Sequence, residues 1–479
     1  MSNMGIFDSA RPDYDPLLKE IANYALYHKI DSLEAYETAR YCFMDSLGCA
    51  LLALNYKECT KLLGPFVPGA EMKNGCRVPG TDYKLDPIQA AFNIGTMVRW
   101  LDYNDTWLAA EWGHPSDNLG AILAVADYLN HQGQSISMKD ILTAMIKAHE
   151  IQGVLAVENS FNKVGLDHVL LVRIASTAVA TAMLGGNETQ VMNALSLAWA
   201  DGGALRTYRH APNTGSRKSW AAGDATSRAV RLALIALTGE MGYPSVMSAD
   251  HWGFQDALFK EQNISLSRSL DSYVMENILF KISYPAEFHA QTAVECALKL
   301  HPEVKNRLDE VKTIHLETQE SGYRIINKVG NLDNPADRDH CLQYMVAIPL
   351  LYGELTADHY EDDIAQNPLI DELRAKMICS ENQTYSKDYL DESKRSIANS
   401  IQVEFKDGSK TEKVEIHYPV GHKRRRSEGI PLLIEKFQQN IKTRFAEETC
   451  KKLDSVCHDQ DNFESKSLDA FMNLICREN

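Results

Sequence analysis

Apolar residues recur three or four positions apart through the first half of the chain. The pattern holds over most of residues 16–239, as Tyr41, Met44 and Leu47 illustrate, and it places these side chains on one face of a helix. Short stretches rich in helix-capping or helix-stopping residues interrupt it. We therefore predict a predominantly helical region with boundaries at Asp31–Ser32, Gly64–Gly69, Ser135–Lys139 and Gly185–Asn187.

The pattern changes near residue 280, where alternation of apolar and polar residues begins. Val311–Thr318 alternates at nearly period two, which is typical of a half-buried strand. The alternation returns in Ile401–Phe405 and Val414–Tyr418, with Asp407–Gly408 between them. Asp-Gly is a favoured turn of β-hairpins. These features predict a smaller α+β domain at residues 275–418.

Helical spacing resumes after this region, in Ile430–Phe445 and Leu468–Ile475. A chain of 479 residues is also too long for one ordinary hydrophobic core. We predict a mainly α fold with two domains. Residues 1–274 form a large all-helical domain that C-terminal helices at residues 419–479 complete, and the α+β domain lies between these two parts of the sequence.

Composition narrows the functional classes. The formal net charge is −16 and the pI is about 5.4, which disfavours binding to the phosphate backbone of nucleic acids. No stretch approaches the roughly 18 uninterrupted apolar residues of a membrane span. Residues 1–15 contain three aspartates and one arginine, unlike a transit peptide. Ten dispersed cysteines without a C-x-x-C pair are expected to be reduced thiols. We expect a cytoplasmic protein that binds neither nucleic acid nor membrane.

Basic residues recur through residues 206–224. No acidic residue precedes Asp224 in this segment. On an acidic chain, such a local excess of cations favours a site for a small anion. A solvated basic loop is the alternative, although a proline, a glycine and a tryptophan give the segment the composition of a shaped loop. The basic side chains are Arg206, Arg209, His210, Arg217 and Lys218.

A second segment, residues 102–118, gathers polar side chains between two helical patterns. Gly113 and Pro115 flank His114 and could aim its ring, although a hydrogen-bonded structural histidine is the alternative. A helix cap explains Ser116–Asn118. The carboxylates and the imidazole could ligate zinc or iron. Their spacing matches no metal signature, and an iron–sulfur centre would need clustered cysteines, so we expect no metal. The polar residues are Asp102, Asp105, Thr106, Glu111, His114, Ser116 and Asp117.

Other candidate residues lie outside these two segments. His168 precedes an apolar run and is either a polar residue at a helix start or a site residue. His149 lies on a helical pattern and is expected to be packed or paired. Tyr284 begins the α+β domain and could reach the cleft between domains, where small-molecule sites often lie. Glu287 and His289 fit an ordinary helix N-terminal turn. The chain has no G-x-S-x-G, Walker or Rossmann motif.

Several long runs resemble those of the MmgE/PrpD family. They are Val78–Thr81, Leu85–Gly95, Trp100–Asn118, Arg206–Thr214 and Asn334–Cys341. The resemblance extends over nearly the whole chain. It implies a large helical domain built from both ends of the chain, a smaller α+β domain and a homodimer. It also implies dehydration of 2-methylcitrate to 2-methyl-cis-aconitate in propionate breakdown by the methylcitrate cycle, without a cofactor or an iron–sulfur cluster.

The resemblance also implies a set of site residues. A related branch of the family decarboxylates cis-aconitate, and its active site contains an Asp, a Thr, two His and a Lys. The matching positions in this sequence are Asp102, Thr106, His114, His168 and Lys218.

Dehydration of a tricarboxylate removes a proton beside a carboxylate and expels a hydroxyl group. These steps need side chains that titrate near neutral pH and cations that offset negative charge. We expect His114 and His168 to be acid and base, in an order that stays open, with Asp102 orienting an imidazole and Lys218 neutralising a carboxylate. The expected substrate-binding residues are Thr106, Arg206, Arg209, Arg217 and Tyr284.

Two other functions stay open. The first is decarboxylation of cis-aconitate, which releases carbon dioxide instead of water. The second is a non-enzymatic helical scaffold or nucleic-acid-binding protein that uses the basic run Lys423–Arg426. A salt-bridged or solvated turn explains that run more simply. Action on citrate beside 2-methylcitrate also stays open.

Overall fold

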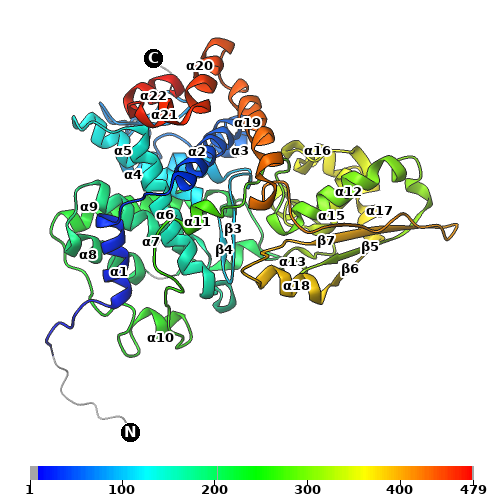
Figure 1. Cartoon of the computed structure of the whole chain (residues 1–479), viewed down its shortest axis with the longest axis horizontal. Helices are drawn as coiled ribbons and strands as arrows, with labels where there is room; N and C mark the ends of the chain where they lie inside the picture. The colour runs from blue at the N-terminus through cyan, green and yellow to red at the C-terminus, as the bar shows by residue number, and fades with distance from the viewer. Residues whose placement is uncertain (1–8, 202, 477–479) are drawn as a thin grey trace, which may run out of the picture.

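The computed structural model describes residues 9–201 and 203–476. Most of the acidic N-terminal segment, residues 1–15, which is unlike a transit peptide, lies outside the described residues. Figure 1 shows a large helical body beside a smaller body built on a sheet. The predicted mainly α fold is confirmed. The helices before the sheet are α1 (Pro16–Tyr27), α2 (Leu33–Ala53), α3 (Lys57–Thr60), α4 (Pro87–Arg99), α5 (Leu119–His131), α6 (Met138–Glu158), α7 (Val169–Met183), α8 (Glu188–Ala200), α9 (Arg217–Leu237), α10 (Phe254–Leu258) and α11 (Tyr273–Glu276).

Capping side chains set several helix boundaries. Ser32 Oγ accepts a hydrogen bond from the Ala35 amide at 3.1 Å at the start of α2. Ser137 and Asn187 form capping boxes at the starts of α6 and α8. Each side chain satisfies amides that the first helical turn leaves unpaired. The boundaries predicted at Asp31–Ser32, Ser135–Lys139 and Gly185–Asn187 are confirmed.

The smaller body contains a four-stranded sheet in the order β6-β5-β7-β8. β5 (Val311–Thr318) pairs in parallel with β6 (Met377–Glu381) and antiparallel with β7 (Asn399–Phe405). β7 also pairs antiparallel with β8 (Val414–Ile416). Gly408 adopts φ 84° between β7 and β8, a conformation that glycine adopts without steric cost. The predicted strand and hairpin are therefore confirmed.

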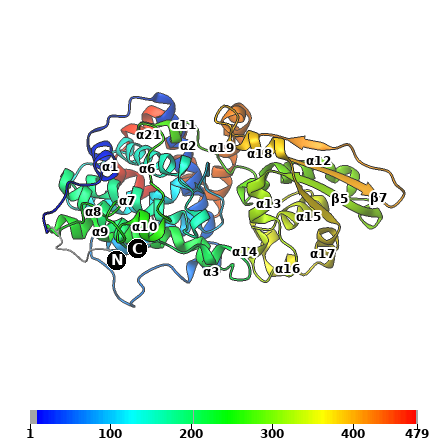
Figure 2. The same cartoon turned by 90° about the horizontal axis from the view of Figure 1, so that it is seen from below.

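Helices cover the sheet and close a separate hydrophobic core. α12 (Gln291–Val304) and α15 (Leu342–Tyr352) contribute buried residues to the same cluster as β5 and β7. Figure 2 shows this body beside the helical one. The other helices of the smaller body are α13 (Glu320–Ile326), α14 (Pro335–Arg338), α16 (Asp362–Ala365), α17 (Pro368–Ala375) and α18 (Gln383–Leu390).

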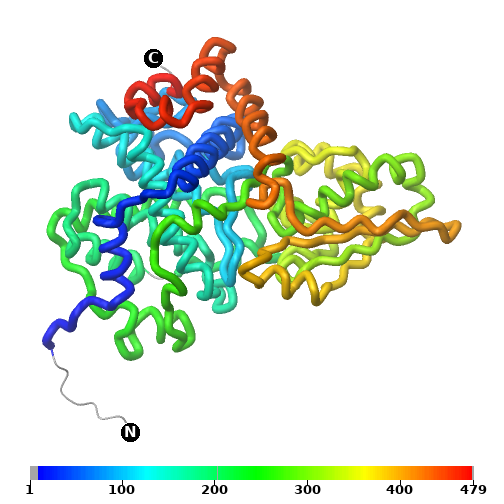
Figure 3. The backbone as a smooth tube through the Cα atoms, viewed as in Figure 1, coloured from blue at the N-terminus to red at the C-terminus, as the bar shows by residue number. Residues whose placement is uncertain are grey.

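The C-terminal helices return to the helical body. In Figure 3 the orange segment that contains α19 (Arg426–Lys442) runs beside the blue segment that contains α2. One buried cluster draws on residues 17–282 and 420–475, and a second draws on residues 286–416. These two separate cores support the proposed domain boundaries near residues 275 and 418. The last helices are α20 (Glu447–His458), α21 (Gln460–Ser465) and α22 (Leu468–Ile475).

Ion pairs hold the basic run Lys423–Arg426 in place. Lys423 Nζ lies 2.8 Å from Glu34, and Arg425 Nη1 lies 2.8 Å from Glu295. The prediction of a salt-bridged turn is confirmed. Within the described ranges, no helix is long and apolar enough to cross a membrane. All ten cysteines fall in those ranges and are free thiols.

Candidate active site

A small closed cavity lies where the two bodies meet. Its volume is about 20 Å³, which holds about one water molecule. The helical body and the segment after α11 supply most of its polar lining: Arg99, Asp102, Thr106, His114, His168, Arg206, Arg209 and Lys281. The smaller body supplies Glu287 and His340, and the apolar lining residues are Leu108, Trp112, Phe288 and Ile325. The cavity therefore joins residues from distant parts of the sequence.

Asp102 is a buried carboxylate held between cations. It follows α4 and adopts φ 51°, in the left-handed region. Arg99 Nη1 donates to its Oδ1 at 2.5 Å, and Lys281 Nζ donates to the same oxygen at 2.8 Å. Burial opposes its ionisation, but these two cations hold the pKa of Asp102 well below its usual range. Asp102 is therefore an anion that favours positive charge on nearby groups.

His114 is oriented by a backbone hydrogen bond. Its Nδ1 lies 2.6 Å from the Asp105 carbonyl oxygen, which can only accept, so Nδ1 carries the proton. Nε2 then holds the lone pair of the neutral ring, 3.5 Å from Asp102 Oδ1. Thr106 Oγ1 lies 3.4 Å from Nδ1. Burial, followed by the charge of Arg99, lowers the pKa of His114 well below its ordinary value. His114 is thus neutral and ready to accept a proton.

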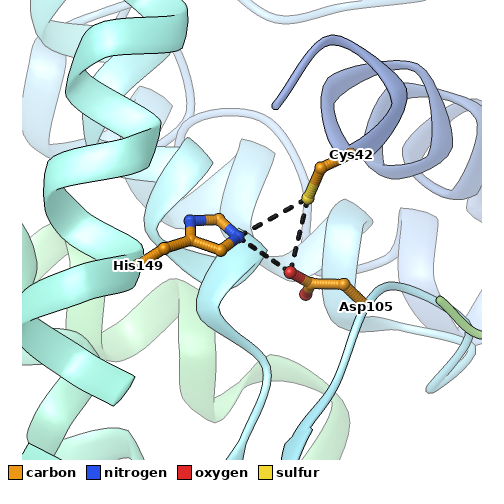
Figure 4. A group of neighbouring side chains, drawn as sticks. All are labelled: Cys42, Asp105 and His149. Carbon is orange, nitrogen blue, oxygen red and sulfur yellow. Dashed lines mark hydrogen bonds and ion pairs between the residues drawn. The ribbon is translucent and has the colours of Figure 1, made fainter. Parts of the chain in front are cut away.

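A buried cluster fixes the loop that carries His114. Figure 4 shows Cys42 from α2, His149 from α6 and Asp105 pointing toward one another. Asp105 Oδ2 lies 2.8 Å from His149 Nε2 and 3.3 Å from Cys42 Sγ, and its Oδ1 accepts from Ser116 N at 3.0 Å. The expectation that His149 is paired is confirmed. The cluster anchors the loop to two long helices.

The helix cap predicted at Ser116–Asn118 is wrong. Pro115–Asn118 is a 3₁₀ helix, and Asn118 makes no capping hydrogen bond at the start of α5. The side chains instead bond other parts of the core: Ser116 Oγ to Asp105 at 2.5 Å and Asn118 Nδ2 to Gln152 at 2.7 Å. Burial brings partners from distant segments within reach, and these partners replace the local cap.

His168 is a buried imidazole that lies beside His114. It lies at the N-terminus of α7 with only 2% of its surface exposed. Among the residues that the structure describes, neither ring nitrogen has a hydrogen-bond partner. The ring centroids of His168 and His114 are 5.9 Å apart. Burial lowers the pKa of His168 well below its ordinary value. Because unpaired buried polar atoms are costly, these nitrogens are candidates for contact with a ligand.

The glycine beside His114 allows this close approach. A Cβ at Gly113 would lie 3.0 Å from Gln152 Nε2 and 3.4 Å from His168 Cδ2. The short pair β3 (Trp107–Leu108) and β4 (Trp112–Gly113) holds the loop in this position. A larger residue at 113 would therefore displace the Gln152 side chain and fill the space beside His168.

Two arginines line the cavity from the 3₁₀ helix Arg206–Arg209. Arg209 binds the Asp167 carboxylate with two hydrogen bonds, at 2.5 and 3.2 Å. Arg206 Nη1 is 3.8 Å from Asp167 and 4.0 Å from Glu111, and it has no hydrogen-bond partner in the described ranges. Burial raises the pKa of Glu111 to about 7. Arg206 can therefore offer a donor to an anionic ligand.

Lys218 lies behind the cavity wall, at the start of α9. Its Nζ donates to the Asp339 carboxylate and lies 3.0 Å from His340 Nδ1. His340 Nε2 is in turn 3.9 Å from Asp102 Oδ2. Burial lowers the pKa of Lys218. Lys218 therefore acts on the cavity through His340, and its ion pair with Asp339 joins the two bodies.

The structure places two predicted substrate-binding residues outside the cavity lining. The Arg217 side chain is 36% exposed and pairs with Asp224 at 2.9 Å. Tyr284 packs against the core of the smaller body. Their predicted contacts with substrate have no support in this geometry. The other predicted residues that line the cavity are Asp102, Thr106, His114, His168, Arg206 and Arg209.

Sequence reasoning missed four polar residues of the cavity. Arg99 lies three residues before Asp102 at the end of a helix, where a basic residue is common. His340 lies in a run that carried the family resemblance, so that run held a usable signal. Lys281 is isolated in the sequence. The sequence predicts Glu287 to be part of a helix N-terminal turn, and its carboxylate does accept a hydrogen bond from the His289 amide at 2.9 Å. Glu287 also lines the cavity.

Two groups of buried side chains have the geometry of metal ligands. Cys42, Asp105 and His149 form one, and Asp102, Asp339 and His340 form the other. In the second group, Lys281 and Lys218 already bind the carboxylates. Their positive charges would repel a divalent cation. In the first group, hydrogen bonds among the three side chains account for their proximity.

Comparison with known proteins supports one family for the whole chain. The MmgE/PrpD N-terminal domain matches residues 19–267, and the MmgE/PrpD C-terminal domain matches residues 284–461. A 2-methylcitrate dehydratase of Escherichia coli (strain K12) is 56% identical over 475 residues, 98% of each chain. One from Cupriavidus necator is 58% identical over 97% of this chain and 98% of its own. The mitochondrial 2-methylcitrate dehydratase of Yarrowia lipolytica is 54% identical over 98% of this chain and 92% of its own. The chain belongs to the MmgE/PrpD family.

Proposed function

We propose that this protein is a 2-methylcitrate dehydratase, which eliminates water from 2-methylcitrate to give 2-methyl-cis-aconitate. The observation that carries the proposal is the pair of buried histidines, His114 and His168, in a cavity lined by cations. The names of the similar proteins support it. The chemistry follows from the charges and the hydrogen bonds of the cavity.

Cations prepare the cavity for a substrate with three carboxylates. Arg99, Arg206, Arg209 and Lys281 line it, against the carboxylates of Asp102 and Glu287. An ion pair at 4 Å is worth about 4 kcal/mol at an effective dielectric constant near 20, before desolvation costs. Planar guanidinium groups can bind carboxylates with two hydrogen bonds. Neutralising a carboxylate also makes the neighbouring C–H group more acidic, because the carbanion charge is stabilised.

His114 acts as the base. Its Nε2 lone pair removes the proton from the methyl-bearing carbon next to a carboxylate, and the C–H electron pair becomes the new C=C bond. The imidazolium that forms is stabilised by Asp102, whose Oδ1 lies 3.5 Å from Nε2. The Asp105 carbonyl holds the ring in the required tautomer throughout.

His168 acts as the acid. The carboxylates of bound substrate raise its pKa toward the protonated form, and Asp167 Oδ1, 3.6 Å from Nδ1, favours the same form. His168 donates its proton to the substrate hydroxyl as the C–O bond breaks, and water leaves. A positioned acid or base contributes roughly 10² to 10⁴ in rate. Thr106 binds substrate within this proposal.

The closed cavity implies that the two bodies separate to admit substrate. A volume of about 20 Å³ is far too small for a tricarboxylate. The Lys218–Asp339 pair crosses the junction and breaks when it opens. Within this proposal the enzyme is a cytoplasmic homodimer and needs no cofactor.

Product analysis tests the function directly. Purified protein, treated with a chelator, is incubated separately with 2-methylcitrate, citrate and cis-aconitate, and the products are identified by NMR. We expect 2-methyl-cis-aconitate from 2-methylcitrate. Itaconate and carbon dioxide from cis-aconitate would instead indicate the decarboxylase branch. Loss of activity after chelation, restored by a metal ion, would contradict the metal-independent mechanism.

A further inference from the structure

A second, larger pocket lies at the same junction of the two bodies. Its volume is about 340 Å³, within the range typical of small-molecule sites. Trp107, Tyr273 and Leu279 form part of an apolar floor. The basic run singled out in the sequence contributes Lys423 and Arg424 to its rim. This pocket is separate from the cavity that holds the histidine pair.

Positive charge dominates the lining of this pocket. Two loops supply it: one after α18 with Lys394 and Arg395, and one after β8 with Lys423 and Arg424. The acidic lining residue is Glu392. Most of these cations have protein partners: Lys394 pairs with Asp388 at 2.6 Å and Lys423 with Glu34 at 2.8 Å. The chain has a formal net charge of −16, yet basic side chains outnumber acidic ones in the lining of this pocket.

Arg395 is the exception among these cations. Within the described residues its guanidinium makes no ion pair, and its Nε is buried without a hydrogen-bond partner. Its backbone adopts φ 46°, in the left-handed region. Non-glycine residues in this region are uncommon and are often found where a side chain binds a ligand. Arg395 therefore lines the pocket with a guanidinium that makes no ion pair among the described residues.

The pocket shares a wall with the catalytic cavity. Leu108 lines both of them. Tyr389 lines the pocket, and its hydroxyl lies 3.2 Å from His289 Nε2. His289 Nδ1 is in turn 2.7 Å from Glu287, which lines the catalytic cavity. A ligand in the pocket would therefore contact Leu108, which also lines the catalytic cavity, and Tyr389, which is linked to that cavity through His289.

We propose that this pocket is a second ligand site, which binds a small anion with two or more carboxylates through Arg395. The planar guanidinium suits a carboxylate, and the cations of the two loops offset further negative charge. The aromatic and aliphatic floor packs against a carbon skeleton. Inorganic phosphate has no such skeleton, so a polycarboxylate fits better. The site is defined by its own residues and does not depend on the proposed reaction.

Calorimetric titration with tricarballylate tests this site. Tricarballylate carries three carboxylates but no hydroxyl group, so it cannot be dehydrated. The wild-type chain is compared with Arg395→Gln and with Arg395→Gly, which suits the left-handed backbone. Both changes are expected to weaken one binding event by about tenfold or more. Turnover at saturating 2-methylcitrate is expected to stay unchanged.

Arg231→Gln on the exposed surface of α9 is the matched control, and it should bind tricarballylate like the wild type. Equal tricarballylate binding by Arg395→Gln, Arg395→Gly and the wild type would overturn the proposal. Loss of all binding and turnover in the folded Arg395 variants would also overturn it, because the pocket would then not be a separate site. Equally tight binding of inorganic phosphate at this site would overturn the polycarboxylate assignment.

Discussion

Lys281 places a buried cation beside the Asp102 carboxylate in the catalytic cavity. It is completely buried, and its Nζ donates to both the carbonyl oxygen and Oδ1 of Asp102. Replacing Lys281 by Met should lower kcat/KM by about a hundredfold or more, because a preorganised cation is lost where negative charge develops. Steady-state kinetics would measure the change. Lys312→Met, on an exposed part of β5, is the control. Activity within about threefold of the wild type would contradict the role of Lys281.

The pH dependence of kcat/KM reports the state of His114 in the free enzyme. Burial and the charge of Arg99 lower its pKa, so the neutral base persists to lower pH than for an ordinary histidine. Activity should therefore fall with decreasing pH only below about 6.5. Lys281 also lowers this pKa, so the acid limb should move to higher pH in Lys281→Met. An acid limb above pH 7 in the wild type would contradict this account.

Arg206 and Arg217 allow a direct comparison of two predicted substrate contacts. Arg206 lines the cavity, and its Nη1 has no hydrogen-bond partner among the described residues, whereas Arg217 is partly exposed and paired with Asp224. Arg206→Gln should raise KM by about tenfold or more, since a charged hydrogen bond is lost. Arg217→Gln should change KM by less than about twofold. The same kinetic assay measures both variants, and the opposite order would restore Arg217 as a binding residue.

The loop at residues 102–118 depends on helices that precede and follow it in the sequence. Asp105 joins it to Cys42 on α2 and His149 on α6. Asp105→Asn should reduce the free energy of unfolding by about 3 kcal/mol, because one partner of a fully buried charged cluster is changed. Urea unfolding would measure this loss of stability. Asp82→Asn, at an exposed position, is the control and is expected to change the free energy of unfolding by less than about 0.5 kcal/mol. Equal stability of the two variants would show that the cluster does not anchor the loop.

Local patterns predicted the elements well. β5 spans Val311–Thr318 and α22 spans Leu468–Ile475, as alternation and helical spacing predicted. These signals are local, because burial of one face imposes a period on the sequence. The cap at Ser116–Asn118 failed for the opposite reason. Its side chains bond residues that are distant in sequence, and no local pattern records those partners.

The catalytic cavity is lined by residues from both bodies, so neither body forms it alone. Concentrated polar segments identified Asp102, His114, Arg206 and Lys218, while His168 was selected by family resemblance. Lys281 is isolated in the sequence, and both Lys281 and His340 join the site because the two bodies meet there. Arg217 shares its segment with Arg206 yet points elsewhere, since a basic segment does not specify which side chains face inward. Composition can therefore locate a site but not assign each residue.

In the proposed reaction His168, in the cavity between the two bodies, transfers a proton during dehydration of 2-methylcitrate. The rate of 2-methyl-cis-aconitate formation is measured for His168→Ala, beside half-buried His315→Ala as the control. Because the ring nitrogens of His168 have no hydrogen-bond partner in the described part of the chain, the variant should stay folded in thermal unfolding. We predict a fall in kcat of about 10² to 10⁴ for His168→Ala and no comparable fall for His315→Ala. A folded His168→Ala protein with a rate near the wild type would contradict the account.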